Sequence, residues 1–481
     1  MTYRRASSAV LAAEALQARS LVIVFAALLG LCLALLTAAP AAAAPISDEE
    51  VQRHSFNLIF GDTEERDAAV EALTARGKPD VAAALILALR YHRVESDRYA
   101  GVLRQLTGGE GRTWFDWMLW QQKHPEVKPH PSFGVFKLTT LLRIDRRFES
   151  FIGPYILEPE AQKIRLEEIT WGGVQVDGIP PLDNPDRIPA AEADYLLDDD
   201  LVFGVEINGD ARAYPLRILG WHEMFNEVIG GVPVALAYCT LCGSGILYET
   251  QVEGREEPLI LSSSGLLYRS NKLMYDRQTE SLWNQFTGRP VSGPLRDSGI
   301  ELKVRPVAIT SWAEWRRANP ETTVLSLDTG HNRDYGSGVV YRDYFASPDL
   351  MFPALVDETE LLQKDYVFGV RGLAESRAWP LSAFAEEMVI NDAVGSRELV
   401  LLGDPVTRTV RAYERRGQTF AKGEGPDVLR GPEGGAWRVT EAALEGPGGE
   451  RLPRVPGHIA YWFAWDGYWG TGSSLYPAPR G

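Results

Sequence analysis

The sequence predicts an α+β protein, with an N-terminal helical region followed by a β-rich body made of two internally repeated modules. Two observations support this prediction. Residues 48–150 carry apolar residues at three- and four-residue spacing, which is typical of amphipathic helices. From about residue 165 onward, short β-branched and aromatic runs alternate with Gly, Pro, Asn and Asp, as in strands and turns, and several runs recur later in the chain.

The first 43 residues have the order of a secretory signal peptide. Three arginines precede an apolar run at 21–36, and an alanine-rich segment follows in which cleavage after Ala43 fits the small-residue rule. An uncleaved anchor is the alternative, because the apolar run is almost long enough to span a bilayer. We therefore expect an exported protein, periplasmic or extracellular, that is membrane-anchored if the segment is retained.

Composition restricts the partners. The chain has 65 acidic and 49 basic residues, a net charge of −16, which argues against nucleic acid and anionic membrane surfaces. No later segment is long and apolar enough to span a membrane, so we expect no stable membrane insertion after signal cleavage. The remaining chain is long enough for two or three domains. The sequence does not specify a protein or small-molecule partner.

Within residues 48–150, helices are expected at 64–74, 80–91 and 96–106, with Gly and Pro between them. An aromatic stretch follows, made up of Trp114, Phe115, Trp117 and Trp120. Such a stretch can stack on carbohydrate, but its helical spacing favours buried helix packing.

The body begins with a strong hairpin pattern. Residues 202–214 read as two strands joined by a type I′ turn at Asn208-Gly209, with positive φ at both turn residues. The apolar spacing of residues 217–229 predicts a helix, and residues 232–238 predict a strand behind which Cys239 opens a loop. Further β segments are expected at 246–251, 259–263 and 281–286, and 458–469 suits a buried strand or an aromatic cluster.

An internal repeat divides this body. Three segments recur without a gap 165 residues later: Asp200-Leu-Val-Phe-Gly-Val as Asp365-Tyr-Val-Phe-Gly-Val, Arg212-Ala-Tyr-Pro-Leu as Arg377-Ala-Trp-Pro-Leu, and Asn226-Glu-Val-Ile-Gly as Asn391-Asp-Ala-Val-Gly. A further match relates 310–315 to 460–465 at an offset of 150. We therefore expect modules at 165–345 and 346–481, with residues 200–230 superposing on 365–395.

The repeat acts as an internal control for function. Residues present in both copies, such as Arg212 and Asn226, are better interpreted as structural. His222, Cys239 and Cys242 occur only in the first copy, and the second copy has Glu387, Asp404 and Thr407 at these positions. These three residues are therefore the stronger candidates for chemistry.

Cys239 and Cys242 are the only cysteines beyond the first 43 residues. A Cys-x-x-Cys pair of this kind is a redox pair, half of a soft-metal site, or a small strained disulfide. A thioredoxin-like fold is disfavoured, because its Cys-x-x-Cys opens a helix, whereas Gly243-Ser244-Gly245 and a strand follow here.

His222 is the predicted third ligand. Its helix leads into the strand that ends at Cys239, so the imidazole and both thiols could meet in one pocket, with the two sulfurs within about 4 Å of each other. Two thiolates and an imidazole suit copper as Cu(I), or zinc. Water, a substrate or His331 could add a fourth ligand, and Glu223 could orient the imidazole. The alternative for His222 is an ordinary hydrogen-bonded helix histidine.

The segment 264–285 is dense in polar groups. One interpretation places four of its residues around the mouth of the cysteine site: Asp276, Arg277, Trp283 and Gln285. The other is a turn at 276–281 whose Asp, Thr and Ser side chains cap the backbone.

Several motifs of residues 165–345 closely resemble the prokaryotic family called domain of unknown function 3179. They include Gly220-Trp-His-Glu, Tyr238-Cys-Thr-Leu-Cys-Gly-Ser and Leu273-Met-Tyr-Asp-Arg-Gln-Thr-Glu-Ser-Leu-Trp. The Tyr-Cys-x-Leu-Cys-Gly motif is specific for this family, although many relatives have Pro where this chain has Thr240. The resemblance extends over most of the chain beyond about residue 130. It supports the position of the site and implies no activity.

Three hypotheses follow. The first is an exported protein with a copper or zinc site at Cys239, Cys242 and His222. The second is a periplasmic thiol–disulfide oxidoreductase in which one cysteine attacks and the other resolves. The third is a binding or scaffold protein in which the two cysteines form a structural disulfide. Whether the protein is an enzyme stays open at this point.

Overall fold

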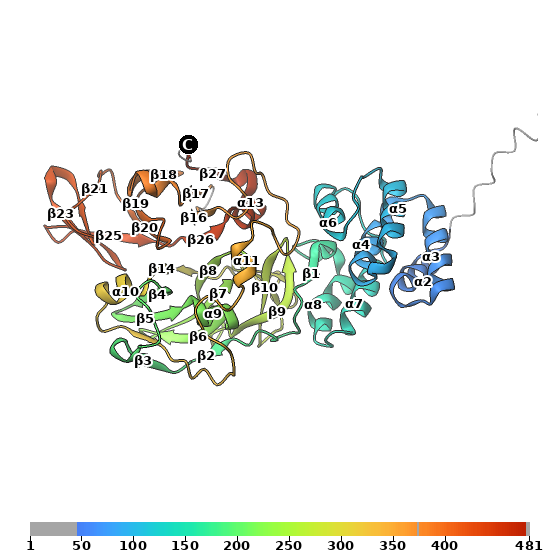
Figure 1. Cartoon of the computed structure of the whole chain (residues 1–481), viewed down its shortest axis with the longest axis horizontal. Helices are drawn as coiled ribbons and strands as arrows, with labels where there is room; N and C mark the ends of the chain where they lie inside the picture. Colours follow the sequence, from blue (N-terminus) through green and yellow to red (C-terminus); the bar gives the residue numbers. More distant parts are fainter. Residues whose placement is uncertain (1–45, 373–374, 478–481) are drawn as a thin grey trace, which may run out of the picture.

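The structure, a computed structural model, describes residues 46–372 and 375–477 of the chain. Helices dominate up to residue 157 and strands dominate from residue 169 onward, which confirms the predicted α+β class. The helices gather at one end of the molecule, and the two copies of the repeat form the other end (Figure 1). The expected signal segment, residues 1–43, lies outside the described residues.

The helical region contains α2 (Asp48–Phe60), α3 (Thr63–Arg76), α4 (Ala82–Tyr91), α5 (Ser96–Thr107), α6 (Trp114–Lys123), α7 (Phe133–Leu142) and α8 (Phe148–Leu157). The helices expected from the sequence correspond to α3, α4 and α5. Ser47, Asp62 and Thr113 start α2, α3 and α6 with capping boxes, in which the cap side chain and an acidic residue three positions later satisfy each other's backbone N–H. Across 46–372 and 375–477, no helix combines the length and apolarity needed to cross a membrane.

The tryptophans of α6 belong to the helical core, and Phe115 packs against a cluster of the body. Trp117 is fully buried in the helical core, and Trp114 and Trp120 pack against the same cluster as Trp117. This is the packing role that the helical spacing of the stretch favours.

Buried polar contacts attach the helices to the body. The ammonium of Lys137 on α7 donates to the carbonyl oxygens of Leu166 (2.6 Å) and Ile169, just where the first strand begins. The buried carboxylate of Glu168 pairs with Arg165 and with Arg269 of the body, each at 2.6 Å. Because both charges of these pairs are largely withdrawn from water, the joint depends on their mutual contact.

The first copy contains β1 (Ile169–Trp171), β2 (Leu182–Asp183), β3 (Arg187–Pro189), β4 (Leu201–Ile207), β5 (Asp210–Pro215), α9 (Leu216–His222), β6 (Met224–Ile229), β7 (Val232–Cys239), β8 (Ser244–Glu249), β9 (Leu261–Tyr268), β10 (Asn271–Asp276), β11 (Leu282–Asn284), β12 (Arg289–Ser292), β13 (Val304–Arg305), β14 (Ala308–Ser311), α10 (Trp312–Ala318), β15 (Thr323–Leu325) and α11 (Arg342–Ala346). Its sheets have the strand orders β1-β9-β10-β11-β12, β13-β8-β7-β6-β2 and β14-β4-β5-β15-β3.

The second copy contains β16 (Tyr366–Val370), β17 (Ser376–Pro380), α12 (Ala383–Glu386), β18 (Val389–Val394), β19 (Arg397–Asp404), β20 (Thr409–Glu414), β21 (Ala421–Lys422), β22 (Val428–Arg430), β23 (Ala436–Val439), β24 (Ala443–Glu445), β25 (Arg451–Val455), β26 (His458–Tyr461), α13 (Trp462–Trp469) and β27 (Ser473–Leu475). Its sheets have the orders β26-β16-β17-β27 and β18-β19-β20-β25-β24-β23-β22-β21.

The two copies share strand pairing residue by residue. Gly204 of β4 pairs with Ala213 of β5, and at the offset of 165 Gly369 pairs with Ala378. Strand β14 lies beside β4 as β26 lies beside β16, with Ala308 opposite Gly204 and His458 opposite Gly369. The two copies expected from the sequence therefore pair their strands in the same register. The module boundaries at 165–345 and 346–481 stay predictions.

A close approach of backbone to tryptophan accounts for one repeated glycine. A Cβ added to Gly204 would lie 2.2 Å from the ring of Trp315, and one added to Gly369 would lie 1.9 Å from the ring of Trp465. Both distances are too short for any side chain. The Phe-Gly-Val sequence therefore recurs because each copy packs a tryptophan onto the same strand position.

The expected hairpin turn is confirmed, with φ of 54° at Asn208 and 86° at Gly209. In the second copy, residues 373 and 374 of the corresponding turn lie outside the described residues.

The prediction of a helix over 217–229 is correct for its first half and wrong for its second. α9 ends at His222, Glu223 takes a left-handed conformation with φ of 57°, and residues 224–229 form β6. Pairing of β6 with β7 along its whole length overrides the helical spacing.

Each copy uses one asparagine to hold a neighbouring segment. The Asn226 side chain accepts from the Leu261 N–H (2.9 Å) and donates to the Leu261 carbonyl (3.0 Å). Asn391 makes the same two contacts with Phe420, at 2.9 and 2.7 Å. A side-chain amide presents a donor and an acceptor side by side, so each shared asparagine is suited to this paired contact, which is the structural role that the repeat indicated.

We expect Asn226→Ala and Asn391→Ala each to lower the free energy of unfolding by about 2–4 kcal/mol, because each leaves a buried N–H and a buried carbonyl without a partner. Urea unfolding followed by tryptophan fluorescence would measure the loss. Asn332→Ala, at an exposed position, is the control and should change stability by less than about 0.5 kcal/mol. Equal stability of all three variants would contradict the structural role.

Candidate functional site

The two cysteines occupy the turn between β7 and β8. Cys239 is the last residue of β7 and pairs across the hairpin with Ser244, the first residue of β8. The Cys242 N–H donates to the Cys239 carbonyl at 3.1 Å, and Gly243 has a φ of 59°. This tight turn places the first and fourth side chains beside each other, close enough for Cys239 to raise the pKa of the Cys242 thiol.

The same turn occurs twice more with oxygen in place of sulfur. At 276–281 the Thr279 hydroxyl donates to the Asp276 carboxylate (2.8 Å), and at 404–409 the Thr407 hydroxyl donates to Asp404 (2.9 Å). The fifth residue is left-handed in all three turns, with φ values of 59° at Gly243, 56° at Glu280 and 56° at Arg408. The Cys-x-x-Cys turn is therefore a thiol form of an Asp-x-x-Thr turn. Its backbone path does not need sulfur.

Both thiols are free and withdrawn from solvent, with 2% of Cys239 and none of Cys242 exposed. Burial is the largest cause that raises the pKa of the Cys242 thiol well above its usual range, and the neighbouring Cys239 side chain adds to the rise. The Asn271 amide and the Lys272 backbone N–H act in the opposite direction by donating to the sulfur. In the free protein Cys242 is therefore a neutral thiol.

An amide network supports the sulfur of Cys242. The Asn271 side chain donates to Cys242 Sγ at 3.1 Å and to Gln285 Oε1 at 3.2 Å. Gln285 in turn donates to the Ala237 carbonyl on β7 at 2.9 Å. The Asn271 amide is thereby held with a donor directed at the sulfur, a position that would stabilise a thiolate.

A buried ion pair lies beside the turn. The Glu223 carboxylate accepts from the hydroxyl of Thr240, between the cysteines, at 2.8 Å. The Lys272 ammonium nitrogen lies 2.6 Å from the other Glu223 oxygen, although it is not aligned for a hydrogen bond. The Tyr341 hydroxyl also approaches Glu223, at 3.4 Å. Glu223 therefore contacts the thiol turn itself. The sequence had suggested that it orients His222, and the structure does not show this contact.

The structure does not bring His222 to the thiols. Its Nδ1 bonds to the Pro180 carbonyl (2.9 Å), and its Nε2 bonds to the Tyr335 hydroxyl (2.5 Å), which also contacts Thr329. Because a carbonyl only accepts, Nδ1 carries the proton and Nε2 accepts from Tyr335. The ring centroid of His331 lies 5.1 Å from that of His222. Within 46–372 and 375–477, no three or more His, Cys, Asp or Glu side chains form a group that could hold a metal ion.

The other predicted site residues divide into two groups. Gln285 belongs to the amide network at Cys242. Asp276 and Trp283 instead belong to the neighbouring Asp-x-x-Thr turn, where the Trp283 indole donates to the Asp276 carboxylate at 2.9 Å. Arg277 bonds to Ser262 and pairs with Asp183, each at 2.6 Å. The backbone-capping interpretation of residues 276–281 therefore describes their contacts.

Sequence reasoning missed several residues that touch the turn, among them Asn271, Lys272, Tyr341, Tyr344 and Tyr461, whose N–H donates to the Cys242 carbonyl at 2.7 Å. Asn271 and Lys272 lie in the segment 264–285. The many polar residues of this segment were the one sign in the sequence that it contributes to the site. Tyr344 donates to the Leu241 carbonyl at 2.6 Å. Tyr341 has an uncommon left-handed φ of 54°, which no local pattern indicated.

We expect the imidazole of His222 to stay neutral well below neutral pH, because burial, the largest cause, lowers its pKa from 6.5 to about 4. The unfolded chain then binds a proton that the folded chain excludes, so the stability contributed by His222 is complete above pH 6.5 and is lost as pH falls toward 4. Nitrogen chemical shifts of the ring should show a protonated Nδ1 and a bare Nε2 at pH 7. A ring that titrates at its ordinary pKa would contradict this arrangement.

No curated protein and no solved structure matches this chain. Residues 176–472, more than half of the chain, match the family described as "Protein of unknown function (DUF3179)". The match includes the thiol turn, its amide network, the Glu223–Lys272 pair and most of the second copy. The chain therefore belongs to the DUF3179 family, as its motifs had indicated.

Proposed function

We propose that Cys239 and Cys242 form a two-thiolate site for a soft monovalent cation, Cu(I). The observation that supports this most is the pair of buried thiols at one turn, with the Asn271 amide directed at the sulfur of Cys242. Thiolates are the ligands that select Cu(I) in proteins. We include export in the proposal, on the order of charged, apolar and small residues in the first 43 positions.

The number of donors favours copper over zinc. Zinc in structural sites takes four ligands, and its catalytic sites take three from the protein. Cys239 and Cys242 supply two, and both ring nitrogens of His222 are already bonded to Pro180 and Tyr335. Two thiolates can hold Cu(I) without further protein ligands, which makes copper the better fit to this turn.

Burial favours a bound cation over thiol–disulfide exchange. Exchange requires a thiolate that a substrate can reach, whereas Cys242 is fully buried with a raised pKa and Cys239 is 2% exposed. A purely structural disulfide is also less well supported. The Asp-x-x-Thr turns at 276–281 and 404–409 follow the same path without any cross-link.

The surrounding groups suit a site that changes charge on binding. Cu(I) would replace the thiol protons, so that two thiolates and one cation carry one net negative charge. Donors from Asn271 and from the Lys272 backbone would stabilise this charge. The Lys272 ammonium pairs with the Glu223 carboxylate, so this carboxylate adds no unpaired negative charge to that of the bound thiolates.

We expect the purified, reduced protein to bind one Cu(I) per chain and Cys239→Ser or Cys242→Ser to weaken binding by more than the roughly 10–100-fold typical of outer-shell changes. Anaerobic competition with the chelator bathocuproine disulfonate would measure the affinity. His222→Ala is the matched control and should retain it, because the imidazole is engaged by Pro180 and Tyr335.

The double variant Cys239→Asp/Cys242→Thr carries the residues of the second copy at this turn. It should fold and bind no copper, since its side chains can make the contact of Asp404 with Thr407. If the wild-type protein binds no Cu(I) after reduction, or if its thiols are joined as isolated and the serine variants lose stability instead of copper, the disulfide hypotheses replace this one.

We further expect Cu(I) affinity to rise with pH, by about tenfold per pH unit for each thiol proton displaced while the pH lies below the thiol pKa. The raised pKa of Cys242 extends this rise in affinity through neutral pH.

Asn271→Ala should weaken Cu(I) binding about tenfold or more, because it removes the donor to the sulfur. The same competition assay at several pH values would test both, and an affinity independent of pH would exclude displacement of thiol protons.

A further inference from the structure

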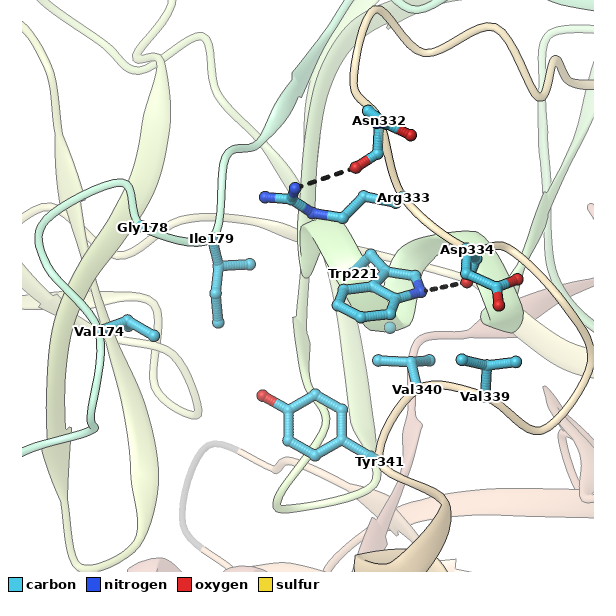
Figure 2. Close-up of a pocket in the computed structure, with 11 residues that line it drawn as sticks. Val174, Gly178, Ile179, Trp221, Asn332, Arg333, Asp334, Val339, Val340 and Tyr341 are labelled. Atoms are coloured by element: carbon cyan, nitrogen blue, oxygen red, sulfur yellow. Dashed lines mark hydrogen bonds between the residues drawn. The ribbon is translucent and has the colours of Figure 1, made fainter.

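A cavity of about 660 Å³ lies beside α9 and is lined in part by Gly220 and Trp221 of that helix. Figure 2 shows Val174 and Ile179 on one side of it and Trp221, Val339 and Val340 on the other. The side chain of Tyr341 lines one end. Its volume falls in the range of small-molecule sites, and its walls are mainly apolar, as in such sites.

The walls are held in place by contacts with α9. The Trp221 indole donates to the Asp334 carbonyl at 2.7 Å, which fastens the 332–341 loop to the helix. Gly220 allows Val340 to pack directly on the same helix, because a Cβ at this position would lie 2.4 Å from Val340 Cγ1. On the opposite wall, His222 bonds to the Pro180 carbonyl at 2.9 Å. The cavity is therefore preformed and not dependent on a ligand to organise it.

One cation faces this apolar space. The Arg333 guanidinium extends between Trp221 and Ile179 (Figure 2), and it lies 5.9 Å from the Trp221 ring centroid. This exposed side chain donates to the Asn332 carbonyl at 3.2 Å, and no carboxylate of the described chain pairs with it. The Asp334 carboxylate lies beyond Trp221 in this view and accepts from the Gly336 N–H at 2.8 Å.

We propose that this cavity binds a small organic carboxylate, whose apolar body packs on Trp221 and Val340 and whose carboxylate pairs with Arg333. An arginine fork can hold a carboxylate through two parallel hydrogen bonds, and such charge-assisted bonds are about twice as strong as neutral ones. The apolar walls require that the rest of the ligand be apolar as well. A simple inorganic anion does not meet this second requirement.

Tyr341 and Glu223 connect the cavity to the thiol turn. Tyr341 lines the cavity and approaches Glu223, which bonds to Thr240 between the two cysteines. The binding site itself, however, contains neither cysteine. The proposal therefore stands independently of copper binding.

Calorimetry with naphthylacetate, its neutral analogue naphthylacetamide, and acetate would test the proposal on the full folded protein. We expect naphthylacetate to bind at least about tenfold more tightly than the amide, from the charge-assisted bonds of Arg333. Acetate should bind too weakly to detect, since it lacks an apolar body. Arg333→Gln should reduce the affinity for naphthylacetate to that for the amide, and leave the amide unchanged.

Two further variants make the test specific. Val340→Trp should fill the cavity and abolish binding of both naphthyl compounds, whereas Arg451→Gln, a distant exposed arginine paired with Glu445, should change nothing. Cys239→Ser/Cys242→Ser should bind naphthylacetate as the wild type does, which separates this site from the metal site. Equal affinity for acid and amide, no detectable binding, or full binding by Arg333→Gln or by folded Val340→Trp would overturn the proposal.

Discussion

The candidate site depends on a backbone constraint, the tight turn that joins two antiparallel strands and places its first and fourth side chains in contact. In this chain the turn occurs with Cys239 and Cys242, with Asp276 and Thr279, and with Asp404 and Thr407. A left-handed fifth residue accompanies it each time. The chemistry of each turn is then set by which atoms stand at the two positions, since the path of the chain is already determined by the strands on either side.

Withdrawal from water decides what the thiol version of this turn can do. An exposed pair of cysteines would exchange disulfides readily, but here a raised thiol pKa and full burial of Cys242 suppress that reactivity. The same burial strengthens the interactions of any charge that forms inside. In the copper site that we propose, Asn271 and the Glu223–Lys272 pair are the groups that would make a thiolate charge tolerable in the interior.

Comparison of the two copies separates scaffold from site. Both copies keep an arginine paired with an acid, Arg212 with Glu227 at 3.0 Å and Arg377 with Asp392 at 2.7 Å. Both copies also keep the asparagine that bonds to a neighbouring segment and the tryptophan that packs on a strand glycine. The second copy has no thiols at its turn and no imidazole where the first has His222. Duplication thus preserved the contacts that hold the strands and left the turn residues free to differ.

Much of this architecture could be derived from the sequence because it depends on local pattern and on repetition. The α+β class, the Asn208-Gly209 turn and the repeated strands follow from periodicity and from turn residues whose backbone preferences are strong. The end of α9 could not be derived in this way, because pairing of β6 with β7 overrides a helical spacing that continues through Ile229.

For the site, the sequence by itself determined which residues carry unusual chemistry, Cys239 and Cys242, and that these sit in a turn. Only the tertiary structure decided their neighbours. It directed His222 to Pro180 and Tyr335, placed Glu223 on Thr240, and brought Asn271 to the sulfur. The physical reason is that a side chain's partners in the interior are chosen by which strands and loops pack together, and spacing along the chain carries no information about that choice.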